Sequence, residues 1–272
     1  MQEDIKLIDL IVELVDARIP LSSRNPDIDE LGKGKARIVL LNKADLADPV
    51  YNKQWMQYFA EKGAHVLEMN SKSGAGIKAI NGLVGEACRE KIERDRKRGI
   101  VNRPVRAMVV GIPNVGKSTF INSFAGKACA KTGNRPGVTK GKQWIRLNKS
   151  LELLDTPGIL WPKFEDQKVG MRLAFIGSIN DDLVVTEELA CDLLTVLREL
   201  YPASVTERYD CMWREKPSEM LEEIARNRGC LQKGQSLDIQ KAAAILIDDF
   251  RSGRLGRLTL ERIPQAGTTK AE

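Results

Sequence analysis

Short apolar runs recur along the first half of the chain, and each ends at glycines or polar residues. The runs cover residues 10–15, 36–41, 64–69, 105–110 and 151–154. Runs that are apolar almost throughout are typical of strands buried on both faces of a parallel sheet. Between them, apolar residues recur at helical spacing, as in segments 55–59 and 77–87. This alternation predicts an α/β fold.

The pattern changes near residue 165. Beyond it, apolar residues at helical spacing mark segments 190–200, 220–225 and 239–250. Apolar faces on consecutive helices predict a small all-α domain. We therefore predict two domains, residues 1–164 and residues 165–272.

The segment from Gly111 to Thr119 reads Gly-Ile-Pro-Asn-Val-Gly-Lys-Ser-Thr and follows a predicted strand. It matches G-x-x-x-x-G-K-[ST], the phosphate-binding loop (P-loop) of P-loop NTPases. Backbone N–H groups and the N-terminus of the next helix surround the phosphates in such loops. We expect Lys117 to reach the β- and γ-phosphates and Ser118 to ligate Mg²⁺. The other predicted phosphate-binding residues of the loop are Asn114, Val115, Gly116 and Thr119.

A second motif, Asn42-Lys43-Ala44-Asp45, directly follows the apolar run that ends at residue 41. N-K-x-D after a buried strand is the guanine-recognition element of GTPases. The carboxylate of Asp45 can accept hydrogen bonds from guanine N1–H and from the exocyclic amine, whereas adenine would leave it unpaired. We expect Asn42 to touch the base and join this loop to the P-loop, and the stem of Lys43 to cover the ring. The motif predicts GTP and GDP as ligands.

A short polar loop follows the next predicted strand and contains Asn70, Ser71 and Lys72. A loop in this position is expected to contact guanine O6 through its backbone. His65, the only histidine, lies in the strand before this loop. Because an isolated histidine needs a partner group to become a catalyst, we expect His65 at the surface or edge of the sheet.

A D-x-x-G motif, Asp155-Thr-Pro-Gly158, completes the predicted site. We expect Asp155 to hold Mg²⁺ through water and the Gly158 N–H to contact the γ-phosphate. Thr139 lies between the P-loop and Asp155, where GTPases place switch I, and could bind Mg²⁺ and sense the γ-phosphate. Ile159 stands where many GTPases have a glutamine that orients the attacking water. Isoleucine cannot do this, so the motifs identify no catalytic residue.

The order of these motifs differs from that of an ordinary GTPase, in which the P-loop comes first, then D-x-x-G, then N-K-x-D. Here N-K-x-D at residue 42 precedes the P-loop at residue 111, and D-x-x-G at residue 155 comes last. A closed set of strand–helix units tolerates this rotation if the original termini lie close together. We predict a circularly permuted, doubly wound P-loop GTPase sheet, with motif order G4-G5-G1-G2-G3 and the site at the strand carboxyl ends.

Charge and cysteine content narrow the class of protein. The 272 residues include 43 Lys and Arg against 37 Asp and Glu, a net charge of +6, which permits a polyanionic partner. The five cysteines are widely spaced without a C-x-x-C pair, so we expect neither a disulfide framework nor a zinc site. No apolar run approaches the length of a membrane span, and we expect a cytoplasmic protein that does not bind membranes.

Segment 126–149 contains many basic residues and no acid. Its basic residues are Lys127, Lys131, Arg135, Lys140, Lys142, Arg146 and Lys149. These are more positive charges than one Mg-GTP needs, so we favour an additional polyanionic partner.

The motifs NKAD, NSKSG, GIPNVGKST and DTPGILWPKFE, in this order, resemble those of the circularly permuted ribosome biogenesis GTPase A family of bacteria. The resemblance covers nearly the whole chain, including Asp16-Ala-Arg-Ile-Pro20. It implies a GTP hydrolase of low basal rate that binds the immature large (50S) ribosomal subunit and its rRNA late in assembly, with no DNA partner. It also implies that the helical domain contacts RNA or the ribosome.

The same resemblance bears on the ions and on catalysis. Asn114 matches a P-loop asparagine that ligates K⁺ beside the phosphates in related potassium-dependent GTPases, and such an ion could replace an arginine finger. The family carries a histidine implicated in hydrolysis before its first strand. We expect this chain to begin after that segment, and His65 does not match it, so the catalytic group stays unassigned.

Three functions remain open. In the favoured one, GTP promotes binding to the ribosomal precursor and hydrolysis drives release. In a second, the protein is a GTP-gated RNA-binding module whose hydrolysis is incidental. In a third, it is a signalling GTPase that acts on protein partners. An RNA partner predicts an affinity that falls steeply with salt, whereas a salt-insensitive interaction would indicate a protein partner.

Overall fold

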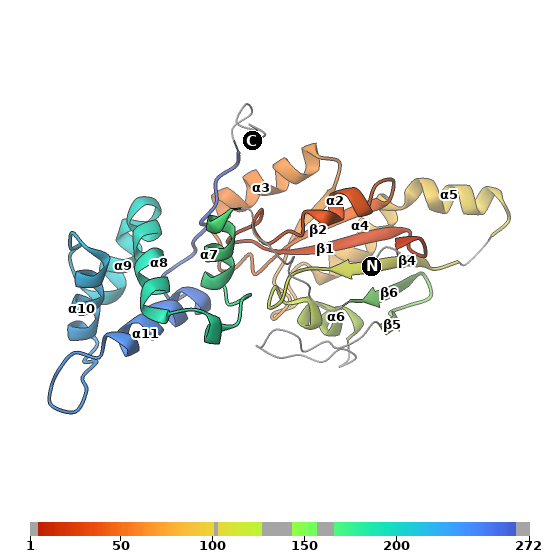
Figure 1. The fold of residues 1–272 in the computed structure, drawn as a ribbon. Helices are drawn as coiled ribbons and strands as arrows, with labels where there is room; N and C mark the ends of the chain where they lie inside the picture. The colour runs from red at the N-terminus through yellow and green to blue at the C-terminus, as the bar shows by residue number, and fades with distance from the viewer. Residues whose placement is uncertain (1–4, 101–102, 127–142, 157–165, 265–272) are drawn as a thin grey trace. The chain divides into compact units, whose positions relative to one another are not determined.

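The computed structural model describes residues 5–100, 103–126, 143–156 and 166–264 (Figure 1). The chain divides into two compact units, Met1–Pro162 together with Glu261–Glu272, and Lys163–Leu260. The first unit contains a β-sheet and the second is helical. None of the helices in the described ranges combines the length and apolar character that a membrane span needs.

The first unit is built on a six-stranded sheet with the order β3-β2-β1-β4-β6-β5. Its strands are β1 (Leu10–Asp16), β2 (Ala36–Asn42), β3 (His65–Glu68), β4 (Val105–Val110), β5 (Gln143–Arg146) and β6 (Leu151–Asp155). Neighbouring strands are parallel except β5, which pairs antiparallel with β6. Each apolar run of the sequence thus forms a parallel strand, and β1 lies at the centre between β2 and β4.

Strand β5 lies within the basic segment 126–149, for which the sequence predicted no strand. Trp144 and Arg146 alternate with Ile145, which is buried. A four-residue alternation that includes a basic residue is too short to distinguish from a loop by periodicity. Pairing with β6 therefore decides the structure of this stretch.

Helices cover both faces of the sheet, and Figure 1 shows α2 (Asp27–Leu31) and α3 (Pro49–Glu61) on the opposite side from α6 (Lys117–Ala125). The remaining helices of this unit are η1 (Ile77–Ala79), α4 (Ile80–Ala87) and α5 (Arg89–Lys97). Trp55 and Phe59 of α3 pack on Val15 and Leu41 of the central strands. This is the predicted doubly wound arrangement, in which apolar strands are buried between two helical layers.

The second unit consists of α7 (Gln167–Phe175), η2 (Asp181–Leu183), α8 (Thr186–Leu200), α9 (Pro202–Tyr209), α10 (Pro217–Asn227) and α11 (Ile239–Ser252). Helices α8, α10 and α11 correspond to the three predicted apolar patterns. Helices α7 and α9 were not predicted. Pro202 begins α9, because proline suits the first turn of a helix.

A buried carboxylate links three segments of this helical unit. Asp249 of α11 accepts hydrogen bonds from Arg208 Nε at 2.8 Å, from the Tyr209 hydroxyl at 3.0 Å, and from Arg254. Burial acts to raise the pKa of Asp249, but these hydrogen bonds outweigh burial and lower it. Ionised Asp249 therefore stabilises the packing of α9 against α11.

Candidate functional site

The predicted nucleotide-binding segments follow the carboxyl ends of neighbouring strands. β1 ends at Asp16, β2 at Asn42 and β6 at Asp155, while β4 leads into the P-loop at Gly111. Because β1 lies between β2 and β4, and β6 adjoins β4, these residues reach one edge of the sheet. Although the motifs occur in a rotated order along the sequence, the loops that carry them follow neighbouring strands at the same edge of the sheet.

Two glycines allow the P-loop to pack closely on this edge. A Cβ atom on Gly111 would lie 3.0 Å from the carbonyl oxygen of Leu14 and 2.9 Å from Val115 Cγ1. A Cβ atom on Gly116 would lie 2.4 Å from Nδ2 of Asn42, and the φ of Gly116 is +98°, in the left-handed region. Side chains at either position would push the loop away from the strands.

Helix α6 begins at Lys117, directly after Gly116, which has no side chain to accept hydrogen bonds from the first N–H groups. The Lys117 ammonium lies 2.8 Å from Oδ1 of Asp155 and also donates to the carbonyl of Thr156. Both charged side chains are buried. The N-terminus of α6, which can bind an anion, thus begins at the ion pair of Lys117 and Asp155. This combination of groups fits a phosphate group with Mg²⁺.

Within the described ranges no three His, Cys, Asp or Glu side chains cluster as a metal site. Ser118 and Thr119 lie in the first turn of α6, beside Lys117. Asn114, the predicted K⁺ ligand, has a left-handed backbone with a φ of 59°.

Asn42 joins three loops through one side chain. Its Nδ2 donates to the carbonyl of Val115 in the P-loop at 2.7 Å, and its Oδ1 accepts from the N–H and the hydroxyl of Ser71, each at 2.9 Å. Only 1% of Asn42 is exposed. Ser123 Oγ of α6 donates to the carbonyl of Ser71 at 2.6 Å. The P-loop, the N-K-x-D loop and the loop after β3 are therefore held together as one structure.

Lys43 connects the guanine-recognition loop to β1. Its backbone is left-handed, with a φ of 57°, and its ammonium donates to the Asn114 carbonyl at 2.9 Å and lies 3.0 Å from Asp16 Oδ2. Asp16 is buried and accepts from Nε and Nη2 of Arg18 at 2.9 and 2.8 Å. Burial acts to raise the pKa of Asp16, but Arg18 and Lys43 outweigh burial and hold it well below its usual range.

Asp16 and Arg18 were not predicted as site residues. The available signal was an acid-x-base pair at the carboxyl end of a strand, Asp16-Ala-Arg18. That pattern alone does not show which loop the pair contacts. The structure shows that it holds Lys43, whose stem is predicted to cover the guanine ring.

The predicted guanine-contacting residues lie around this framework. Asp45 is exposed. Asn70 Oδ1 accepts from the backbone N–H groups of Lys72 and Ser73 at 2.8 and 3.1 Å, and so shapes the turn of the loop. Ser71, in the same loop, is buried. Lys72 is exposed at the surface of the loop.

Thr139, Gly158 and Ile159 lie outside the described residues. His65 begins β3, an edge strand of the sheet, as the sequence predicted. The nucleotide loops follow the other end of that strand, three residues later at Glu68. At about 3.3 Å per residue this separation is about 10 Å, so His65 is not part of the site.

The C-terminal segment after α11 returns to the first unit, although the sequence placed all of 165–272 in the helical domain. Glu261 is 3% exposed and accepts from the N–H groups of Leu21 and Ser22 at 2.6 and 3.0 Å and from the Ser22 hydroxyl. The Arg262 guanidinium lies 3.8 Å from the centre of the Tyr51 ring. These contacts, distant in sequence, explain why the segment belongs with the sheet.

Comparison with known proteins agrees with this geometry. A sequence profile described as 50S ribosome-binding GTPase matches residues 106–212. The ribosome biogenesis GTPase A of Bacillus cereus is 48% identical over 268 residues, which are 97% of this chain and 90% of that protein. Its counterpart in Thermotoga maritima is 30% identical over 258 residues, 95% of this chain and 87% of that protein.

A solved structure shares the fold along the whole length. The GDP-bound structure of TM YlqF superposes with a TM-score of 0.72 at 27% sequence identity, covering 96% of this chain and 97% of that one. The identity to curated relatives and the common fold extend through both units. The chain is therefore a GTP hydrolase that belongs to the ribosome biogenesis GTPase A family.

Proposed function

We propose that GTP and GDP bind at the carboxyl ends of β1, β2, β4 and β6. Asp45 accepts hydrogen bonds from the guanine N1–H and amine, and the loop Asn70–Lys72 contacts O6 through its backbone. Residues 114–119 and the Gly158 N–H bind the phosphates. The observation that carries this proposal is the buried side chain of Asn42, because its hydrogen bonds join the P-loop, the N-K-x-D loop and the loop after β3.

We propose the metal ligands from the motifs of the sequence. Ser118, Asp155 and Thr139 would hold Mg²⁺, and Asn114 would hold K⁺. When bound, these ions supply positive charge to the phosphates that react. Lys117 supplies a further charge from the P-loop. Because Ile159 cannot orient water, we expect a low basal rate of hydrolysis that depends on K⁺ or on the partner.

We propose the immature large ribosomal subunit, through its rRNA, as the partner in the cytoplasm. Support comes from the 50S ribosome-binding GTPase profile and from the names of the relatives. The net charge of +6 and the basic segment 126–149 suit an RNA surface. In this cycle GTP favours binding and hydrolysis drives release.

Co-sedimentation with immature and mature large subunits tests the proposal. We expect retention on immature subunits with a non-hydrolysable GTP analogue and release when GTP is hydrolysed. Release with the analogue would instead favour a GTP-gated RNA-binding module. Absence of co-sedimentation in every nucleotide state would overturn the choice of partner.

The Asp45→Asn variant is the control for guanine recognition. An asparagine amide can donate to the carbonyl that xanthine has in place of the guanine amine. We therefore expect Asp45→Asn to lose binding to GTP and to recover it with xanthosine triphosphate. Unchanged GTP affinity in this variant would show that Asp45 does not read the base.

A further inference from the structure

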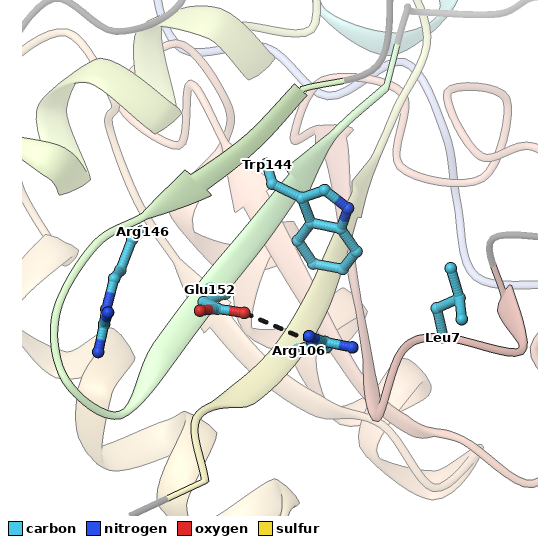
Figure 2. A pocket seen from close by; sticks show the side chains of 5 residues that line it. All are labelled: Leu7, Arg106, Trp144, Arg146 and Glu152. Carbon is cyan, nitrogen blue, oxygen red and sulfur yellow. Dashed lines mark hydrogen bonds and ion pairs between the residues drawn. The ribbon is translucent and has the colours of Figure 1, made fainter.

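A hollow of about 210 Å³ opens on the sheet of the first unit, away from the nucleotide loops. Its lining residues are Leu7, Arg106, Trp144, Arg146 and Glu152 (Figure 2). We call it the Trp144 hollow. Trp144 is 43% exposed and Leu7 is 54% exposed, which is unusual for large apolar side chains. The hollow thus combines an accessible aromatic ring with three charged groups.

The strand register explains why these side chains share one face. Arg146 of β5 lies opposite Glu152 of β6, and Arg106 of β4 lies beside Glu152 on the other side. Trp144 precedes Arg146 by two residues on β5 and so points to the same face. Ile145, between them, points to the other face and is buried. Three adjacent strands therefore place a guanidinium–carboxylate–guanidinium row beside an indole ring.

The row of Arg106, Glu152 and Arg146 contains two positive charges and one negative charge. Arg106 Nε lies 3.4 Å from a carboxylate oxygen of Glu152, and the Arg106 guanidinium carbon lies 5.4 Å from the centre of the Trp144 ring. Figure 2 shows the Arg106 guanidinium near both partners. Within the described ranges no acidic side chain forms an ion pair with Arg146, which is exposed. One positive charge is thus left for a ligand.

The Trp144 hollow lies apart from the nucleotide site, and its size limits the ligand that it can bind. Glu152 precedes Asp155 by three residues on β6, a distance of about 10 Å at about 3.3 Å per residue. Pockets for drug-sized ligands or cofactors usually enclose about 300–1,000 Å³. The smaller, open Trp144 hollow suits one flat group with a charged neighbour.

We propose that the Trp144 hollow binds an unpaired base of single-stranded RNA. The base stacks on the exposed part of the Trp144 ring, and Arg146 binds the adjoining phosphate. Unpaired RNA bases characteristically stack on aromatic side chains and guanidinium planes. This inference deepens the proposed function, since it assigns to the ribosomal RNA partner a specific surface on the GTPase unit.

Charge favours RNA over a protein partner at this surface. Tryptophan and arginine are also common at protein interfaces. Here, however, β5 follows directly on the segment that contains Lys140 and Lys142, and Lys149 comes soon after it. A continuous stretch of sequence without acids suits a phosphate backbone, whereas a protein surface would present charges of both signs.

Fluorescence anisotropy with a labelled single-stranded oligouridine tests the proposal. We expect Trp144→Ala to weaken binding about 5- to 150-fold, the range for loss of one stacked base, and Trp144→Phe to keep most of the affinity. Arg146→Gln should weaken binding and reduce the salt slope by about one. The matched control is Lys53→Gln on the exposed surface of α3, which removes the same charge and should change little.

Each other outcome has a distinct meaning. Unchanged oligouridine binding by Trp144→Ala would overturn the proposal, as would equal losses in Lys53→Gln and Arg146→Gln. If Trp144→Ala lost affinity for ribosomal subunits but not for oligouridine, the hollow would bind a protein. If wild-type protein bound oligouridine through Trp144 but never co-sedimented with subunits, the hollow would stand and the proposed partner would fail. Unchanged GDP affinity in every variant shows that the fold is intact.

Discussion

Replacement of Asn42 tests the central feature of the nucleotide site. Asn42→Ala removes the donor to the Val115 carbonyl and the acceptor for the Ser71 N–H. Asn42→Asp has nearly the same shape and keeps the acceptor for Ser71, but it places an oxygen 2.7 Å from the Val115 carbonyl oxygen. The two variants therefore separate the guanine-loop contact from the P-loop contact.

The expected loss of stability follows from burial. Asn42 is 1% exposed, so water cannot readily replace its hydrogen bonds. A buried polar group left without a partner costs about 1–3 kcal/mol. Asn42→Ala leaves two such main-chain groups, which predicts a loss of about 2–6 kcal/mol in the free energy of unfolding of the first unit. Asn42→Asp should cost at least about 1–3 kcal/mol, because Val115 loses its donor.

Hydrogen exchange of the amides of β1 and β2 measures this loss, since it reports the opening of the sheet separately from the helical unit. A matched control is Asn70→Ala, which removes an amide side chain from a neighbouring loop. Its hydrogen bonds to Lys72 and Ser73 are exposed, so the expected cost is only about 0.5–1.5 kcal/mol. If Asn42→Ala cost no more than Asn70→Ala, the proposed role of Asn42 in joining the loops would be wrong.

Three further changes have defined outcomes. Gly116→Ala should reduce GDP affinity at least about tenfold in calorimetry, because its Cβ atom would lie 2.4 Å from Nδ2 of Asn42. Gly63→Ala is the control, because Gly63 also has a positive φ but has open space around it, and this variant should keep its GDP affinity. Equal effects of the two substitutions would contradict the packing argument. Glu261→Gln should lower the free energy of unfolding of the first unit by about 1–3 kcal/mol in urea denaturation, because the glutamine NH₂ group would face the N–H donors of Leu21 and Ser22. An unchanged urea midpoint would show that this contact does not hold the C-terminal segment. Asp249, whose pKa is lowered on folding, stabilises the helical unit fully above the ordinary value of 3.8, and this contribution is lost as the pH falls through the lower folded value. Asp249→Asn should therefore weaken the acid dependence of thermal unfolding, and parallel acid profiles would refute this.

The strands and motifs of the first unit were predictable because each depends on a few consecutive residues. The run 105–110 became β4, and the glycine loop after it leads into α6 as predicted. The circular permutation was also readable, since it is simply the order in which the motifs occur. In the second unit, only the helices with complete apolar faces were recognised.

The features missed by sequence reasoning depend on pairing between distant segments. Strand β5 is defined by its register with β6 rather than by its own four residues. The Asp16–Arg18 pair gains a role only because Lys43 reaches it from another loop. Glu261 contacts Ser22 across 239 residues of sequence, a distance that no local pattern describes.

Local sequence was enough to predict the chemistry of this protein, because phosphate binding by backbone N–H groups and guanine recognition by one carboxylate each depend on a few consecutive residues. Tertiary structure decided how those parts cooperate. Asn42 meets Val115 from 73 residues away, and the Trp144 hollow exists only where three strands align their side chains. Hydrogen bonds and stacking surfaces require exact distances between atoms, and a folded sheet sets those distances for residues that are far apart in the chain.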